Sequence, residues 1–392
     1  MTESRTLPLL ACAGFASMAS MRMCDAMLPA LAQAFGTRAA DAAGTISAFA
    51  LAYGLMQLIY GSLGDRFGKA RIISLAAWGC AGTSVAASFA PSLELLTVGR
   101  GLMGGFAAGI IPLTMAWIGD RVPYEQRQEA LARLLTWTLL GMMLGAWAGG
   151  ALAQLANWRS AFVAVAVLFA AAAFGVSRAG RDERPHASAT GIAAYAANVA
   201  ELLRSPWTRR VLAVVFVEAG LVGGAMAFVP TALHDRLQLT LLEAGGVLAL
   251  FGLGGLVYSR LAGRAVRRLG APALAVAGAG CLALAFALLA AMPSLVVSAA
   301  ACLLAGFGFY LLHNTLQTCA TQLSATARGT GVSLFASALF LGQAIGVTLA
   351  AAVVARHSPA AWFIGAAPLL LALGVYFATR LRMRLAAGRA LA

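Results

Sequence analysis

Residues 41–68, DAAGTISAFALAYGLMQLIYGSLGDRFG, match residues 243–270, EAGGVLALFGLGGLVYSRLAGRAVRRLG, without a gap at an offset of 202. Four matched pairs are identical or similar: Asp41 and Glu243, Gly44 and Gly246, Gly61 and Gly263, and Gly68 and Gly270. Five more pairs agree at an offset of 201: Pro29 and Pro230, Gly105 and Gly306, Arg127 and Arg328, Gly141 and Gly342, and Gly145 and Gly346. Chance does not give this agreement over such a length, so the chain is predicted to contain two copies of one unit.

The composition places both copies in a membrane. Apolar residues make up 61% of the 392 residues, charged residues only 11%, and the mean hydropathy is +0.84. A soluble domain carries about 25% charged residues, and roughly 20 apolar residues cross a bilayer as a helix. Twelve such stretches lie near 8–34, 44–63, 72–91, 95–119, 134–153, 160–177, 211–233, 243–262, 272–291, 296–320, 330–354 and 360–379.

The predicted fold is an all-α membrane protein with twelve transmembrane helices in two parallel six-helix repeats. Residues 1–177 and 211–392 form the two bundles, joined by a basic linker at 178–210 with an amphipathic helix from about 191 to 203. Such a helix lies on the membrane surface. Transporters built from parallel repeats bind their substrate near the bilayer midplane, between halves that rock against each other. The first apolar stretch is too long for the apolar h-region of a signal peptide, and it runs through Pro29 without an evident cleavage site.

The distribution of basic residues sets the orientation. If the N-terminus is cytoplasmic, loops and tails on that side hold 22 of the 28 Lys and Arg residues, and the opposite side holds four. This bias is the positive-inside rule, so we expect a bacterial inner-membrane protein with both termini in the cytoplasm and no nucleic-acid partner. All six cysteines fall in predicted spans, and no disulfide is expected.

The loop at 61–71 reads GSLGDRFGKAR. Its glycines permit close helix approach and a tight turn, its aspartate accepts hydrogen bonds at a helix end, and its basic residues bind a neighbouring helix or anionic headgroups. The spacing resembles the loop between helices 2 and 3 of the major facilitator superfamily. That resemblance implies a conformational latch that favours the outward-facing state; a simple basic turn is the alternative. The residues concerned are Gly61, Asp65, Arg66, Gly68, Lys69 and Arg71.

Two further patterns resemble the same superfamily. Arg100 opens RGLMGGFAAG in the fourth span, with Met103 where the family usually has glutamine. The fifth span carries GMMLGAWAGG, which resembles the glycine motif of exporters that exchange substrate for protons, with Ala146 in place of the family's proline. These glycines also serve as small surfaces for helix packing. They are Gly141, Gly145, Gly149 and Gly150.

Five ionisable residues fall inside predicted spans: Arg22, Asp25, Arg100, Glu218 and His313. A charged residue at the centre of a span costs about 2.5–3.5 kcal/mol on insertion scales, so each is expected to have a partner or a function. Their depths predict an outer cluster of the first three residues and an inner pair of the last two. In the superfamily that the chain resembles, helices 1, 4, 7 and 10 line the central cavity, and these helices carry all five.

Asp25 or Glu218 is the candidate carrier of a coupling proton. Desolvation favours the neutral form of a carboxyl group and a nearby arginine favours its charged form, so rocking could switch between the two effects. The alternative for Asp25 is a permanent structural pair with Arg22 or Arg100. Glu218 has no evident fixed cationic partner and is preferred, whereas His313 is either a wall residue or a second carrier. Polar residues expected to bind substrate are Asn314, Gln317 and Gln343.

These features predict a secondary active transporter without cofactors, driven by the proton gradient and working as a monomer in the bilayer. Its predicted activity is efflux of small drug-like or amphipathic compounds; the alternatives are proton-coupled uptake of an organic solute and, from the Met and Cys residues at 18–27, copper transport. No Ser–His–Asp grouping, metal-ligand spacing or P-loop occurs, so an enzyme is not expected and no metal site is assigned.

Overall fold

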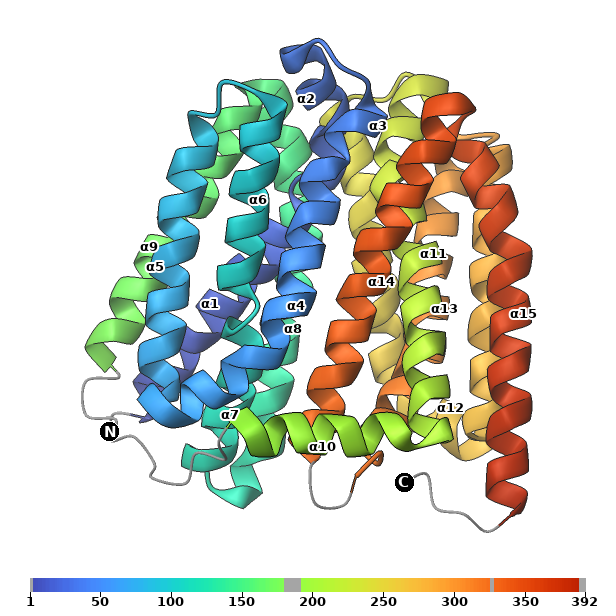
Figure 1. The fold of residues 1–392 in the computed structure, drawn as a ribbon. Coiled ribbons are helices and arrows are strands. Elements are labelled where there is room, and N and C mark those ends of the chain that lie inside the picture. Colours follow the sequence, from blue (N-terminus) through green and yellow to red (C-terminus); the bar gives the residue numbers. More distant parts are fainter. Residues whose placement is uncertain (1–2, 180–191, 325–327, 388–392) are drawn as a thin grey trace. The chain divides into compact units, whose positions relative to one another are not determined.

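The structure is a computed structural model that describes residues 3–179, 192–324 and 328–387. Every regular element in these ranges is helical (Figure 1). The elements are α1 (Glu3–Arg22), η1 (Asp25–Met27), α2 (Leu28–Phe35), α3 (Ala39–Ala42), α4 (Gly44–Phe67), α5 (Lys69–Ser88), α6 (Leu93–Ala107), α7 (Ile110–Arg121), α8 (Tyr124–Leu155), α9 (Trp158–Ala179), α10 (Ile192–Arg204), α11 (Pro206–Leu237), α12 (Leu241–Ala291), α13 (Leu295–Ala320), α14 (Arg328–Arg356) and α15 (Pro359–Ala386).

The chain forms two compact units, Met1–Ala194 and Tyr195–Ala392. Within the predicted linker, α10 occupies the segment for which the sequence predicts an amphipathic helix, and residues 180–191 lie outside the described ranges. The boundaries 1–177, 178–210 and 211–392 remain a prediction.

Eleven apolar segments of the described residues are long enough to cross a membrane. The longest, α12, has 51 residues, which as a straight helix would measure roughly 77 Å against a hydrocarbon core of about 30 Å. It therefore contains two spans, and its backbone turns at Gly270, where φ is 72°. Counting α12 twice gives the predicted twelve-helix architecture.

In each unit, one glycine with positive φ joins the second span to the third. Gly68 has φ 90° and lies between α4 and α5, and its partner in the repeat, Gly270, has φ 72°. Residues with a Cβ atom rarely adopt such angles. The match between these glycines in the sequence therefore reflects a shared turn geometry.

The acidic match in the repeat has an equally local cause. The Asp41 carboxylate accepts a hydrogen bond from the Arg38 backbone N–H at 3.2 Å, and the Glu243 carboxylate accepts one from the Thr240 backbone N–H at 2.9 Å. Each acid is the third residue of its helix and closes a capping box, which satisfies donors that a helix N-terminus leaves unpaired. The two acids are thus equivalent caps.

Helix pairing is the same in both units. In the first unit α4 packs on α6, α1 on α8, and α5 on α9. In the second, the first half of α12 is equivalent to α4, and the corresponding pairs are α12 with α13, α11 with α14, and α12 with α15. Each unit is therefore held by three equivalent helix pairs.

Glycines set the separation within these pairs. A methyl group built on Gly141 or Gly145 of α8 would overlap the carbonyl oxygen of Phe15 or Ala19 on α1, and one on Gly149 would overlap that of Met23. Gly150, the last residue of the motif, is also buried. In the second unit Gly342 and Gly346 of α14 meet the carbonyl oxygens of Phe216 and Gly220 on α11 in the same way, at the same offset of 201.

One predicted match needs correction. Gly306 of α13 meets the carbonyl oxygen of Phe251, and the residue that meets the equivalent Phe49 is Gly104, not Gly105. The fourth span of each unit therefore aligns at an offset of 202. In both units the glycine lies where the fourth span closely approaches the backbone of the second span.

The first and fourth spans are broken, which the sequence does not predict. The first divides into α1, η1 and α2, and the fourth into α6 and α7. Each break includes the residue four positions before a proline, Pro29 or Pro112, where the proline lacks the N–H that a continuous helix needs and its ring crowds the carbonyl. Proline alone is not sufficient to break a span. The helix α11 continues through Pro230.

The fifth span is longer than its apolar part. It is predicted at 134–153, whereas α8 spans Tyr124–Leu155 and begins with a polar segment. An ion pair between Glu129 and Arg133 lies along this extension. Hydropathy predicts only the part of a helix that lies in an apolar environment, so it does not detect the polar first turns of α8.

Gly145→Ala is expected to destabilise the protein by about 2–3 kcal/mol, since its methyl group must push α1 and α8 apart. Gly82→Ala is the matched control, because a Cβ at Gly82 meets nothing within 4 Å and alanine favours the helix. Thermal unfolding of the purified variants in detergent compares them. Equal unfolding temperatures for the two variants would contradict the close-packing role.

Candidate functional site

Arg100, on α6, is completely buried and binds the backbone of two other spans. Its Nη1 donates to the carbonyl of Ser20 at 2.9 Å, and its Nε donates to that of Thr45 at 3.2 Å. The guanidinium also lies 4.3 Å from the centre of the Phe49 ring, a favourable cation–π arrangement. Arg100 therefore fastens α6 to α1 and α4.

The break after α1 explains why these acceptors are available. The last carbonyls of a helix have no partner within it, and Ser20 and Met21 lie in the last turn of α1. Arg100 donates to both, with the bond to Met21 measuring 3.5 Å. A positive charge at a helix C-terminus also complements the helix dipole, so Arg100 serves as the cap of the broken helix.

Asp25 lies within the same break, in η1. Its side chain is fully buried, and its Oδ2 accepts a hydrogen bond from Arg22 Nη1 at 2.9 Å. Its Oδ1 is buried without a hydrogen-bond partner among the described residues. The predicted cluster of Asp25, Arg22 and Arg100 is thus divided: Asp25 pairs with Arg22 on its own span, and Arg100 binds main-chain carbonyls.

In the second unit, α11 and α13 bring Glu218 and His313 together. Glu218 is fully buried, and its Oε2 lies 3.0 Å from His313 Nδ1. The other carboxylate oxygen, Oε1, is buried and has no hydrogen-bond partner in the described part of the chain. This arrangement leaves one vacant acceptor on a carboxylate that has been removed from water.

Two aromatic rings enclose the histidine. The Phe309 ring stacks on it at 4.8 Å with an interplanar angle of 14°, and the Phe335 ring lies 5.3 Å away at 45°. These contacts hold the imidazole so that Nδ1 faces Glu218. The sequence analysis missed both phenylalanines, although Phe309 lies one helical turn before His313 and is detectable from that spacing.

The three polar residues proposed to bind substrate have different environments. Gln343 on α14 is buried, and the aliphatic part of its side chain covers Gly223 of α11. Asn314 is partly exposed and Gln317 is exposed, both on α13 with His313. Within the second unit, Gln343 thus belongs to the packing of α11 and α14.

The latch loop forms a small ion-pair network. Lys69, at the start of α5, binds the carboxylate of Asp65 at 3.1 Å and also that of Asp120 at the end of α7. Gly68 makes the turn, and Arg66 and Arg71 are exposed. The network connects the second, third and fourth spans.

Close approach at this loop comes from another glycine than predicted. A Cβ on Gly61 would meet nothing within 4 Å, whereas one on Gly64 would overlap the Leu113 side chain on α7. The sequence analysis also missed Asp120 as a partner of Lys69. It could have been found as an acidic residue at the end of a span on the side of the membrane where most loops are basic.

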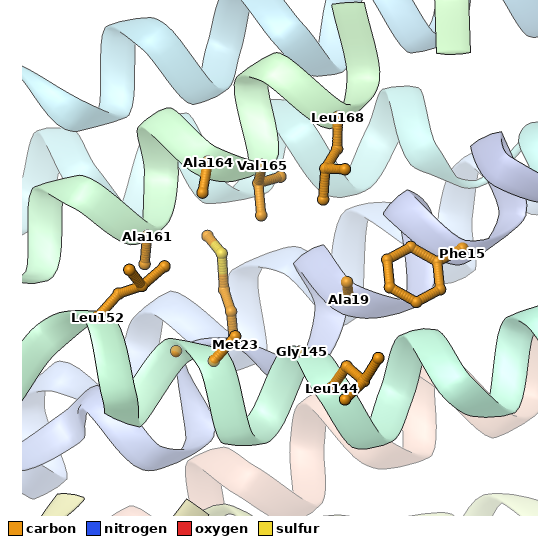
Figure 2. Close-up of a pocket in the computed structure, with 12 residues that line it drawn as sticks. Phe15, Ala19, Met23, Leu144, Gly145, Leu152, Ala161, Ala164, Val165 and Leu168 are labelled. Carbon is orange, nitrogen blue, oxygen red and sulfur yellow. The ribbon is translucent and has the colours of Figure 1, made fainter. Parts of the chain in front are cut away.

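A small apolar pocket of about 90 Å³ lies between α1, α8 and α9 (Figure 2). Met23 extends into it towards Ala164 and Val165, and none of its lining residues has a polar side chain. Met23 therefore fills space between helices, which is the ordinary packing role of methionine. The pocket offers nothing to orient a polar substrate.

Duplicated six-helix units, twelve apolar spans and buried ionisable groups in both units define a multi-pass membrane transporter. The family model described as Major Facilitator Superfamily matches residues 10–330. The chain belongs to this superfamily and is a transporter, not an enzyme.

Several proteins with similar sequences are named as efflux pumps. The chain is 34% identical over 143 residues to the multidrug efflux pump LfrA of Mycolicibacterium smegmatis, covering 36% of this chain and 28% of LfrA. It is 31% identical over 148 residues to the multi-drug resistance efflux pump PmrA of Streptococcus pneumoniae, covering 38% of this chain and 37% of PmrA. These matches span less than half of either pump. An uncharacterised transporter of Bacillus subtilis, YceJ, is 26% identical over 83% of both chains.

Solved structures share the fold at low identity. The nucleoside transporter NupG superposes with a TM-score of 0.75 at 14% identity, covering 95% of this chain and 97% of NupG. The peptide transporter POT gives 0.76 at 16% identity, covering 97% of this chain and 94% of POT. These likenesses support the architecture alone.

Arg100→Met is expected to lower the stability by about 3 kcal/mol or more, because it leaves buried carbonyls of α1 without donors. Arg100→Lys keeps the charge but has no fork of donors to reach α1 and α4 together, so it should fall between Arg100→Met and wild type. The measurement is thermal unfolding in detergent, with the exposed Arg382→Ala as control. Wild-type stability of Arg100→Met would show that the guanidinium is not a cap.

Proposed function

We propose that this protein is a proton-coupled exporter of small drug-like or amphipathic compounds that works by alternating access. The proton gradient replaces any cofactor, and the working unit is a monomer. The bias of basic residues to one side supports a location in the bacterial inner membrane with both termini in the cytoplasm.

The observation that carries the coupling proposal is the buried Glu218 carboxylate. One oxygen is bound to His313 and the other has no partner in the described part of the chain. At this distance a proton can pass between the Glu218 carboxyl group and the adjacent imidazole, which is the requirement for a proton carrier.

Asp25 is the second candidate carrier. Arg22 stabilises its charged form, but its Oδ1 remains unpartnered. It also lies in a broken span, and transporters of other folds place coupling-ion sites at such breaks. No ion pair joins Asp25 to Arg100, so Arg22 is the counterion of the carboxylate that forms when Asp25 loses its proton.

Export is favoured over uptake by the relatives. Two of the proteins that the chain resembles are named as multidrug or multi-drug resistance efflux pumps, and α8 carries the four glycines that resemble an exporter motif.

Glu218→Gln is expected to reduce transport driven by a pH gradient at least tenfold, because glutamine keeps the shape of the side chain but cannot release a proton. Asp25→Asn should have a similar effect if Asp25 shares the role. The measurement is accumulation of a fluorescent lipophilic cation in proteoliposomes, with Glu201→Gln on α10 as the exposed control. Undiminished gradient-driven transport in both Glu218→Gln and Asp25→Asn would refute proton coupling through these residues.

The same vesicles separate export from uptake. With an acidic interior, an antiporter accumulates the cation as protons leave, whereas a symporter moves its substrate out together with protons. Accumulation is the expected result, and net loss from preloaded vesicles would favour the uptake alternative.

A further inference from the structure

The second unit contains an open groove of about 440 Å³ between α11 and α15. Its volume lies in the range of ~300–1,000 Å³ of pockets that hold small molecules. Six of its lining residues are Arg209, Arg210, Ala213, Val217, Leu373 and Tyr376. The groove lies on a different face of α11 from the buried Glu218, because Val217 is 41% exposed.

One end of the groove is strongly basic. Arg209 and Arg210 lie near the start of α11 and are exposed. Neither forms an ion pair with any acidic residue that the structure describes. Arg380 of α15 does not line the groove, but its guanidinium lies 5.4 Å from the centre of the ring of Tyr376, which does. Guanidinium groups of both helices thus lie at or beside the same end.

The rest of the groove is apolar and runs into the membrane. From Arg209 to Val217 the helix rises about 12 Å, and α15 supplies Leu373 and Tyr376 on the other side. Tyr376 is 42% exposed. A charged end at the basic surface and an apolar channel behind it suit a molecule with an anionic head and a hydrocarbon chain.

We propose that this groove binds an anionic phospholipid of the leaflet on the basic side of the membrane. Its phosphate binds Arg209 and Arg210, whose planar donors match phosphate oxygens, and one acyl chain lies along Val217, Leu373 and Tyr376. Basic pockets between transmembrane helices on this side bind anionic headgroups. Free phosphate would use only the arginines and a neutral lipid only the channel, whereas a phospholipid of negative charge uses both.

The test measures lipid binding to the purified full-length protein in dodecyl maltoside by native mass spectrometry and thermal shift. Phosphatidylglycerol and phosphatidylcholine with identical acyl chains are compared. We expect phosphatidylglycerol to bind wild type about tenfold or more tightly than phosphatidylcholine. The double variant Arg209→Ala/Arg210→Ala should lose this preference.

Two further variants keep the test specific. Arg264→Ala/Arg268→Ala removes the same charge from exposed positions of α12 and should retain the preference. Ala213→Trp fills the channel and should weaken phosphatidylglycerol binding while both arginines remain. Equal binding of the two lipids to wild type, or equal loss in both arginine pairs, would overturn the proposal. A thermal shift reproduced in full by inorganic phosphate would show a simple anion site instead.

Discussion

Inside the hydrocarbon of a bilayer there is no water to solvate a backbone carbonyl, so a helix can break only where other groups complete its hydrogen bonds. The first span breaks before Pro29, and the carbonyls of Ser20 and Met21 receive the Arg100 guanidinium from a different span. The charge and the break therefore depend on each other. The break stabilises a buried cation with carbonyl dipoles, and the cation keeps the break from exposing unpaired acceptors. Asp25 lies within this break, in η1.

The same constraint distinguishes polar groups that are satisfied within their own helix from those that are not. Hydroxyl groups such as those of Ser84, Thr114 and Thr315 donate to carbonyls one turn earlier in their own helices and need no outside partner. The carboxylates of Asp25 and Glu218 each keep one buried oxygen without a partner among the described residues. Other buried polar atoms among the described residues also lack a partner, but Asp25 and Glu218 are the carboxylates among them, and they are the residues proposed above to carry the coupling proton.

The repeat, the spans and the pairing of Glu218 with His313 followed from sequence because they depend on side-chain type and spacing. The capping boxes at Asp41 and Glu243 and the turns at Gly68 and Gly270 are local, so they leave a signal at fixed positions. Arg100 was placed with Asp25 because a sequence shows charges and does not show main-chain acceptors. The breaks near Pro29 and Pro112 were also missed. A proline does not by itself predict a break, because Pro230, the equivalent of Pro29 in the second copy, lies within the continuous helix α11. The polar start of α8 has no hydropathy signal.

Because the chain contains two copies of one unit, features that both copies share can be distinguished from features that changed after the duplication. Caps, turn glycines and crossing glycines occur at equivalent positions, so they date from the ancestor that had a single unit. The ionisable groups do not: Met226 stands where the first copy has Asp25, and Ser17 stands where the second has Glu218. At least one copy changed at each of these sites after the gene doubled. The two copies therefore share the residues that set helix ends, turns and crossings, whereas the buried ionisable residues differ between them.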